Sequence, residues 1–109
     1  MKIDFNKMEE EIKPNFKGGE KEYRVKDYTD DLNKIMRGRL IPGASIGLHT
    51  HETNSEIIYI IKGSGKTICD GVELRLNEGD CTYCKKGHNH TLINDTNEDL
   101  IFFAVVCTQ

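Results

Sequence analysis

The amino-acid sequence predicts an all-β domain, folded as a sandwich or a barrel. From Glu22 onward, short stretches that suit β-strands are separated by turn residues at intervals of roughly eight to twelve positions. No stretch with helical periodicity interrupts this region. One stretch, 57–61, is apolar on both of its alternating faces, which is typical of a strand that is covered on both sides.

Turn-forming residues set the boundaries of the expected strands. Pro42-Gly43 favours a turn, and Asp70-Gly71 is the clearest two-residue hairpin in the chain. The strands that we expect between such turns span 23–28, 34–41, 45–51, 56–61, 66–69, 72–76, 81–84, 90–93 and 100–107.

The beginning of the chain has a different character. Asn6 followed by Glu9 resembles a capping box, which predicts a short helix over 7–13 that ends before Pro14. Gly18 and Gly19 then interrupt the chain. We therefore expect an N-terminal arm, 1–20, and a β-barrel domain, 21–109.

Composition indicates one domain with a thin core. Of the 109 residues 37% are apolar and 30% are charged, and small scaffolds of this kind usually add a metal, disulfides or a partner subunit. The net charge of −3 comes from interspersed signs, which gives no basic surface for nucleic-acid phosphates. The first thirteen residues hold no continuous apolar run, so we expect a soluble cytoplasmic protein with no membrane partner.

Both faces of the strand at 56–61 need cover. Ile58 and Ile60 share the face of Glu56 and can point into the barrel, whereas Ile57 and Tyr59 point away from it. A second subunit is the preferred cover for the outer face, which predicts a homodimer. An N-terminal segment wrapped over this face is the alternative.

Cys69, Cys81, Cys84 and Cys107 are expected to be free thiols, because no secretion signal accompanies them. Cys81 and Cys84 resemble a CxxC pair, but their odd spacing on one strand points them to opposite faces. That arrangement keeps them too far apart to form a disulfide.

Three histidines and one glutamate have a pattern that suits a metal site. His49 and His51 are two apart, so a strand presents both on one face, and Glu56 follows after a short polar loop. His90 completes the set only if the chain folds back opposite the first pair. A zinc-protease HExxH helix is excluded, because the fifth position of the motif, which begins at His51, is Ser55 and not histidine.

Imidazole and carboxylate ligands together favour a divalent transition metal ion, which includes Fe, Mn, Zn, Ni, Co and Cu. Four protein ligands leave about two positions open on a six-coordinate ion. Such open positions allow a substrate or ligand to reach the metal.

Two motifs that contain these residues resemble those of the cupin family. The first cupin motif is matched by Gly43, His49, His51, Glu56 and Gly63 at the family's spacing. The second is matched by Gly79, Gly87, His90 and Asn94, with Lys85 in the place of a proline. The resemblance implies a single jelly-roll barrel with His49, His51, Glu56 and His90 as metal ligands, and a looser turn before His90 where the proline is missing.

The same resemblance implies the orientation of several other side chains. Thr82 and Cys84 would face the barrel interior, with Cys84 near the pocket, whereas Cys81 and Tyr83 would face out. His88 is expected in an exposed turn, and the alternative places it at the mouth of the site.

Arg37 and Arg39 share one face of their expected strand. We interpret them as solvated strand charges. The alternative hypothesis is a clamp for carboxylate or phosphate at the mouth of the barrel.

Two functions fit this sequence. The first is a metal-dependent enzyme of the dioxygenase, isomerase or lyase type that acts on a small oxygenated molecule. The second is a module that binds a small molecule, such as a sugar or an organic acid, without catalysis. The sequence identifies no catalytic residue beyond the four ligands, and a purely structural metal is a third hypothesis.

Overall fold

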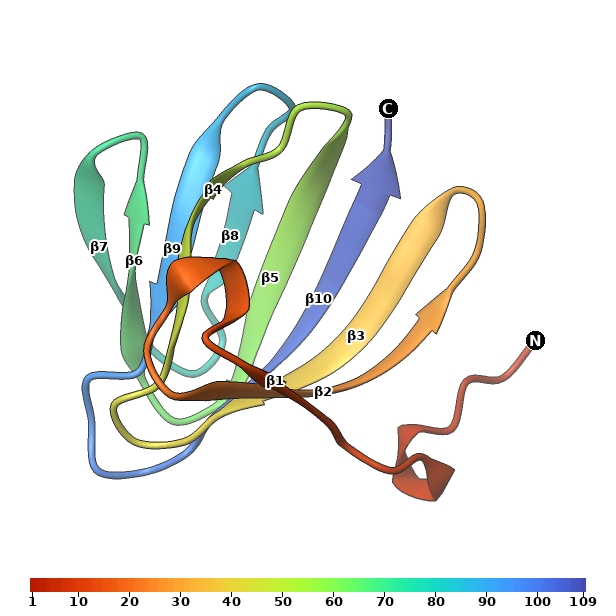
Figure 1. Cartoon of the computed structure of the whole chain (residues 1–109), viewed down its shortest axis with the longest axis horizontal. Coiled ribbons are helices and arrows are strands. Elements are labelled where there is room, and N and C mark those ends of the chain that lie inside the picture. Colours follow the sequence, from red (N-terminus) through yellow and green to blue (C-terminus); the bar gives the residue numbers. More distant parts are fainter.

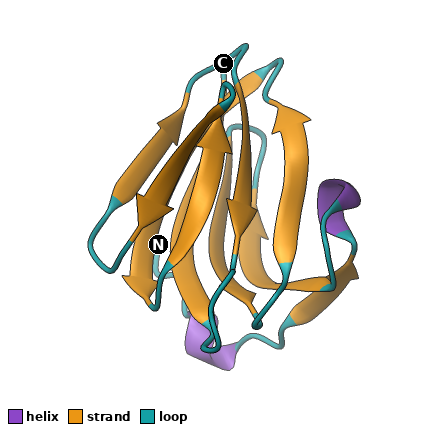
Figure 2. Ribbon diagram, turned by 90° about the vertical axis from the view of Figure 1, so that its left-hand side faces the viewer, coloured by secondary structure: helices purple, strands orange, loops and turns teal.

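The computed structural model describes all 109 residues, and antiparallel strands make up nearly all of its regular structure (Figures 1 and 2). A six-stranded sheet has the order β1-β2-β3-β10-β5-β8, and a four-stranded sheet has the order β4-β9-β6-β7. Every expected strand is present, so the all-β prediction is confirmed. The bounds are β1 Glu11–Pro14, β2 Glu22–Thr29, β3 Asn33–Leu40, β4 Ser45–Thr50, β5 Asn54–Lys62, β6 Gly65–Cys69, β7 Val72–Leu76, β8 Cys81–Cys84, β9 Asn89–Ile93 and β10 Leu100–Thr108.

The predicted helix over 7–13 is wrong. Instead, Phe5–Lys7 form one 3-10 turn, η1, which is capped by the Asp4 side chain. Residues Glu11–Pro14 form the strand β1, which pairs with β2. A helix of seven residues is too short to be stable without tertiary packing, whereas the free edge of β2 offers backbone hydrogen bonds. A second 3-10 turn, η2, spans Phe16–Gly18. None of the helical segments is long and apolar enough to cross a membrane.

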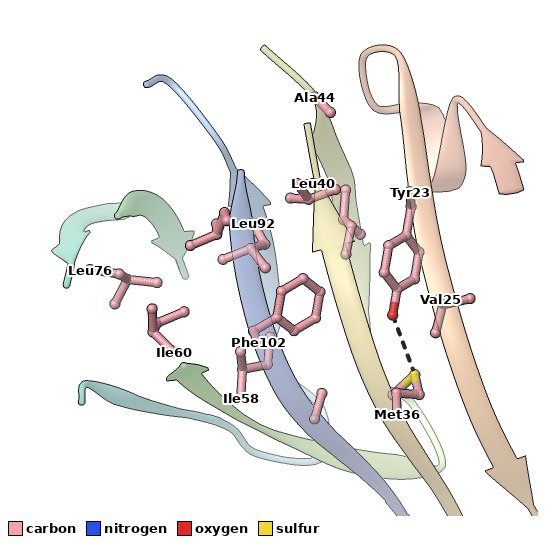
Figure 3. Packing of buried hydrophobic residues seen from close by; sticks show 13 residues of the cluster. Tyr23, Val25, Met36, Leu40, Ala44, Ile58, Ile60, Leu76, Leu92 and Phe102 are labelled. Atoms are coloured by element: carbon pink, nitrogen blue, oxygen red, sulfur yellow. Dashed lines mark hydrogen bonds between the residues drawn. The ribbon is translucent and has the colours of Figure 1, made fainter. Parts of the chain in front are cut away.

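A dry core fills one end of the space between the sheets (Figure 3). Phe102 on β10 is 1% exposed and stacks on Tyr23, with 5.8 Å between the ring centroids. Gly38 lies beneath these rings, where an added Cβ would collide with Phe102. The hydroxyl of Tyr23 donates to the sulfur of Met36 at 3.6 Å. Glycine at position 38 therefore lets two aromatic rings pack across β3.

The alternation predicted for β5 is confirmed. Ile58 and Ile60 are buried, whereas Ile57 and Tyr59 are 41% and 45% exposed on the outer face. Asp70 and Gly71 both have positive φ between the paired residues Cys69 and Val72, as a two-residue hairpin of the expected kind requires.

Arg37 and Arg39 lie on the outer face of the six-stranded sheet and do not line the cavity beside the histidines. Arg39 donates to Glu10 at 2.5 Å and to Asp99 at 3.0 Å, so it ties the N-terminal segment and the loop before β10 to this sheet. The hypothesis of a clamp at the barrel mouth is therefore wrong.

All four cysteines are free thiols, as expected. Cys81 is exposed and Cys84 is buried, which confirms that they point to opposite faces of β8.

Candidate metal centre

The four predicted ligands converge at the other end of the barrel. His49 lies on β4, His51 just after it, Glu56 on β5 and His90 on β9. Their candidate ligand atoms all lie within 4.8 Å of one another. His51 and His90 are buried, Glu56 is 9% exposed, and His49 is half-buried. The chain therefore does fold back to place His90 beside the other three side chains.

An irregularity in β4 aims the first histidine inward. Ile46 is buried in the core and His49 faces the same interior, although residues three apart point to opposite faces of a regular strand. The pairing of β4 with β9 shifts between these two residues, as in a β-bulge, and then aligns His49 with His90. The spacing of the histidines gives no sign of this bulge.

The distances between the ligand atoms fit a shared cation. His51 Nε2 and His90 Nε2 are 2.9 Å apart, and Glu56 Oε1 lies 3.0 Å from His90 Nε2 and 3.3 Å from His51 Nε2. Two ligands at right angles, each about 2.1 Å from a metal ion, lie about 3 Å apart. The donor set therefore has the chemistry and the spacing that a transition metal needs.

The outer ring nitrogens of two histidines are held by hydrogen bonds. His49 Nδ1 is 2.7 Å from the Gly47 carbonyl oxygen, and His51 Nδ1 is 2.5 Å from Asn54 Oδ1. Because a carbonyl oxygen can only accept, each Nδ1 carries a proton, and in the neutral ring each Nε2 presents a lone pair to the centre. His90 Nδ1 is buried and has no hydrogen-bond partner among the protein atoms.

Asn54 was not singled out from the sequence. Its position between His51 and Glu56 is the one available signal, because a polar residue in that short loop is close to two ligands.

The titration of these groups reflects their packing. Burial opposes ionisation of Glu56, but hydrogen bonds from His51 and His90 outweigh it and hold the pKa of this carboxyl at about 2. The bond to Glu56 raises the pKa of His51, whereas burial lowers the pKa of His49. The centre therefore keeps an ionised carboxylate in a buried position.

The turn before His90 is anchored to the centre despite the missing proline. The Lys85 carbonyl accepts from the His88 amide at 3.0 Å, and Gly87 takes the positive φ of +87° that closes the turn. The Gly87 amide donates to the His51 carbonyl at 2.6 Å, and the His51 amide donates to the His88 carbonyl at 3.0 Å. Backbone hydrogen bonds thus hold the loop where the resemblance implies a looser turn.

A cavity of about 410 Å³ opens beside the centre. His49, His51 and Glu56 contribute to its wall, together with Lys34 from β3, which was not singled out from the sequence. His88 lies outside this cavity, is exposed as expected and pairs with Asp70 at 2.6 Å.

Cys84 also lies outside the cavity wall, although it is buried and pairs in register with Glu56. Burial raises the pKa of its thiol to about 11, which makes it a poor nucleophile near neutral pH.

Two antiparallel sheets that enclose a cluster of three histidines and a glutamate define a small β-barrel protein with a candidate metal centre. The chain belongs to the cupin family, because the family described as Cupin domain matches residues 36–106. The predicted family resemblance is therefore confirmed.

Proteins similar to this chain include two from Thermotoga maritima and one from Salinispora arenicola. An oxalate-binding protein of Thermotoga maritima is 39% identical over 72 residues, which cover 66% of this chain and 60% of that protein. The chain thus spans less than two thirds of this curated relative. The crystal structure of a predicted oxalate decarboxylase, also from Thermotoga maritima, matches the whole of both chains with a TM-score of 0.94 and 30% identity. A cupin 2 conserved barrel domain protein from Salinispora arenicola, at 22% identity and a TM-score of 0.78, covers 98% of this chain and 88% of its own and shares the fold.

Proposed function

We propose that the chain holds one divalent transition metal ion on His49, His51, Glu56 and His90 and uses it to bind a small carboxylate. The observation that carries this proposal is the convergence of the four ligand atoms within 4.8 Å beside an open cavity. Histidine and glutamate suit Fe, Mn, Zn, Ni, Co or Cu, and a six-coordinate ion with these ligands keeps about two positions for a ligand. When bound, the ion supplies a Lewis acid for the oxygens of an anion.

The residues around the centre prepare it for that role. The bonds from His49 to Gly47 and from His51 to Asn54 fix both rings with Nε2 toward the site. In the metal-free centre, hydrogen bonds from His51 and His90 keep Glu56 ionised, and a bound cation would take over that role. The names of the two Thermotoga proteins support a carboxylate, with oxalate as the first candidate.

A second candidate function is catalysis on the same class of molecule, as a metal-dependent dioxygenase, isomerase or lyase. The open cavity beside the centre favours it, because a reacting molecule can reach the site. Binding without turnover is the primary proposal, because the phenol of Tyr23, which contributes to the cavity wall, is a poor proton-transfer group: burial raises its pKa.

The deciding experiment begins with elemental analysis of protein purified without nickel affinity. Metal-free protein is then reconstituted anaerobically with Fe(II), Mn or Zn, and oxalate binding is measured by titration calorimetry. We expect one metal per chain and oxalate binding that depends on it. The same samples are assayed for formation of formate and carbon dioxide and for consumption of oxygen. A product that forms only with metal present would show that the protein is an enzyme and not a binding module.

His90→Gln and His88→Gln form a matched pair for this test, because His90 is buried in the centre and His88 is exposed outside it. The first variant should lose most of its metal and its oxalate binding, and the second should keep both. Oxalate binding by His90→Gln at the strength of the wild type would contradict the proposal.

We also propose a homodimer formed through the outer face of the six-stranded sheet. Ile57, Tyr59, Tyr83 and Phe103 are between 36% and 55% exposed on neighbouring strands of this face. The N-terminal segment covers only its margin, where Phe5 meets Phe103 edge-on. Sedimentation should show a dimer for the wild type and a monomer for Tyr59→Asp, and a monomeric wild type at micromolar concentration would contradict the proposal.

A cytoplasmic location is the corresponding proposal for the cell. Its support is the set of four free thiols, which suits a reducing compartment. Fractionation of cells that express the native chain tests it, and recovery from a secreted or periplasmic fraction would contradict it.

A further inference from the structure

Lys34 faces the candidate metal centre across one strand. On β10, Val106 pairs with Lys34 of β3 on one side and with Glu56 of β5 on the other, so the three residues form one row across the sheet. Side chains in such a row share a face, and strands two apart are separated by about 10 Å. The long side chain of Lys34 therefore extends over the same cavity as Glu56, and both residues contribute to its wall.

Lys34 has no ion-pair partner in the structure, because no carboxylate oxygen lies within 4.0 Å of its Nζ. It is half-buried, and burial lowers the pKa of its ammonium group, as does the nearby Lys13. Asp27 and Glu11 are close enough to raise that pKa but do not contact the ammonium group directly. A partly desolvated cation of this kind gains stability when an anion reaches it.

A second lysine reaches the cavity from the N-terminal segment. Lys17 lies in η2, which packs backbone-to-backbone against β4: an added Cβ on Gly47 would collide with the Lys17 carbonyl. Its Nζ lies 5.5 Å from the centre of the Phe16 ring, and Lys13 Nζ lies 5.3 Å from the same ring. Lys17 and Lys34 both contribute to the wall of the cavity, and Lys13 contacts the Phe16 ring beside Lys17.

The charges of the cavity favour an anion with two negative charges. With a divalent ion in place, the positive charges at the cavity come from the ion, Lys17 and Lys34. The negative charges come from Glu52 and Glu56. Two positive charges then remain in excess. A ligand with one carboxylate on the metal would neutralise only one of them.

We propose that Lys34 binds the second acidic group of a small dianion whose first carboxylate lies on the metal, so that the centre selects dicarboxylates over monocarboxylates. This inference rests on the proposed function and deepens it by naming the class of ligand. Lys34 approaches from the sheet that also carries Glu56, while Lys17 adds attraction from the exposed side of the mouth. The ammonium group forms a charge-assisted hydrogen bond with the free carboxylate.

The test compares dicarboxylates with a monocarboxylate on metal-loaded protein. Titration calorimetry with oxalate, malonate and acetate is carried out on the wild type, Lys34→Gln, Lys34→Arg and Lys26→Gln. Lys26 is the matched control, because it lies on the outer face of the same sheet, away from the cavity. Metal content and thermal unfolding are measured for each variant, and Lys34→Met replaces Lys34→Gln if the latter does not fold.

We expect Lys34→Gln to weaken oxalate binding by about tenfold to a hundredfold, which is the range for loss of a charged hydrogen bond, and to change acetate binding less than about twofold. Lys34→Arg should restore much of the difference, and Lys26→Gln should match the wild type. Failure of the metal-loaded wild type to bind any of the three anions would remove the proposed function. Oxalate binding that is unchanged in Lys34→Gln, or equal affinity of the wild type for oxalate and acetate, would overturn the role of Lys34 and leave carboxylate binding intact.

Discussion

The two ends of the barrel differ in what fills the space between the sheets, although the same strands supply both. Toward one end β5 contributes Ile58 and Ile60 and β9 contributes Leu92, all of them buried in the apolar cluster. Toward the other end the same strands contribute Glu56 and His90. The dry end holds the buried apolar cluster, and the polar end gathers four ligand atoms beside a cavity. Each of these strands therefore supplies residues that stabilise the fold at one end and residues suited to bind a metal ion at the other. Mutations can perturb the two ends separately.

The largest effect should come from the dry end. Phe102→Ala removes a ring that is 1% exposed and stacked on Tyr23, and large-to-small changes of this kind cost about 3–5 kcal/mol of unfolding free energy. Urea denaturation measures the loss. Leu74→Ala is the matched control: its side chain is 48% exposed on β7, away from the proposed dimer face, so it should lose about 1 kcal/mol or less. Equal losses in the two variants, or loss of metal from folded Phe102→Ala protein, would break the division between the ends.

Much of the dry end could be predicted from the sequence. Alternation in 56–61 correctly placed Ile58 and Ile60 inside, because the side-chain period of a strand is two and one face must be buried. The segment 7–13 misled us, because a local capping signal was outweighed by pairing of β1 with the edge of β2. That pairing joins residues distant in the sequence, so no local signal reports it.

The polar end shows the same limit. The spacing of His49, His51 and Glu56, together with the cupin resemblance that adds His90, predicted which four residues meet. The bulge that turns His49 inward depends on the pairing of β4 with β9. Lys34 reaches the cavity only through the register of β3, β10 and β5. In the sequence it is one of 15 basic residues, with nothing to distinguish it.

The next largest effect on stability should come from a change of pH that alters the protonation of the histidines at the polar end. In the metal-free protein the bond to Glu56 raises the pKa of His51 above its unfolded value, so this group stabilises the fold below about pH 6.5, and the contribution is lost as the pH rises through the raised pKa. Protons compete with the metal for the same nitrogen, so the metal-bound protein should show the opposite trend. At metal concentrations near a hundred times Kd the added stability is about 2.7 kcal/mol.

Thermal unfolding at pH 6 and pH 8, with and without metal, measures this difference. The gain in Tm on adding metal should grow as the pH rises, whereas Glu56→Gln should reduce both the gain and its pH dependence. A metal-induced gain that is independent of pH would show that the histidine cluster is not where the metal binds.

Removing a residue that orients a metal ligand should weaken metal binding less than removing a ligand itself. Asn54→Ala removes the acceptor that holds His51 Nδ1 at 2.5 Å, which leaves the ring free to rotate out of position. Loss of such a contact weakens metal binding by about tenfold to a hundredfold. Competition with a chelator measures the affinity, and the exposed Asn97→Ala should match the wild type. An unchanged affinity in Asn54→Ala would mean that the cluster orients His51 by itself.

The smallest effect is expected on the outer surface of the dry end, where Glu10 pairs with Arg39. Hydrogen bonds from Arg39 lower the pKa of Glu10 against the opposing effect of burial, so the carboxylate stabilises the fold above about pH 4.5, and this contribution is lost as the pH falls through the lowered pKa. Partly exposed ion pairs contribute about 1 kcal/mol or less, because water and salt screen them. Glu10→Gln should therefore lower the free energy of unfolding less than Phe102→Ala does at pH 7, and it should not lower it at pH 2.5. The control is Glu9→Gln, because Glu9 is exposed and unpaired, and this variant should match the wild type at both pH values. A loss at pH 7 as large as that of Phe102→Ala would mean that the arm held by Glu10, and not the buried rings, keeps this end of the barrel closed.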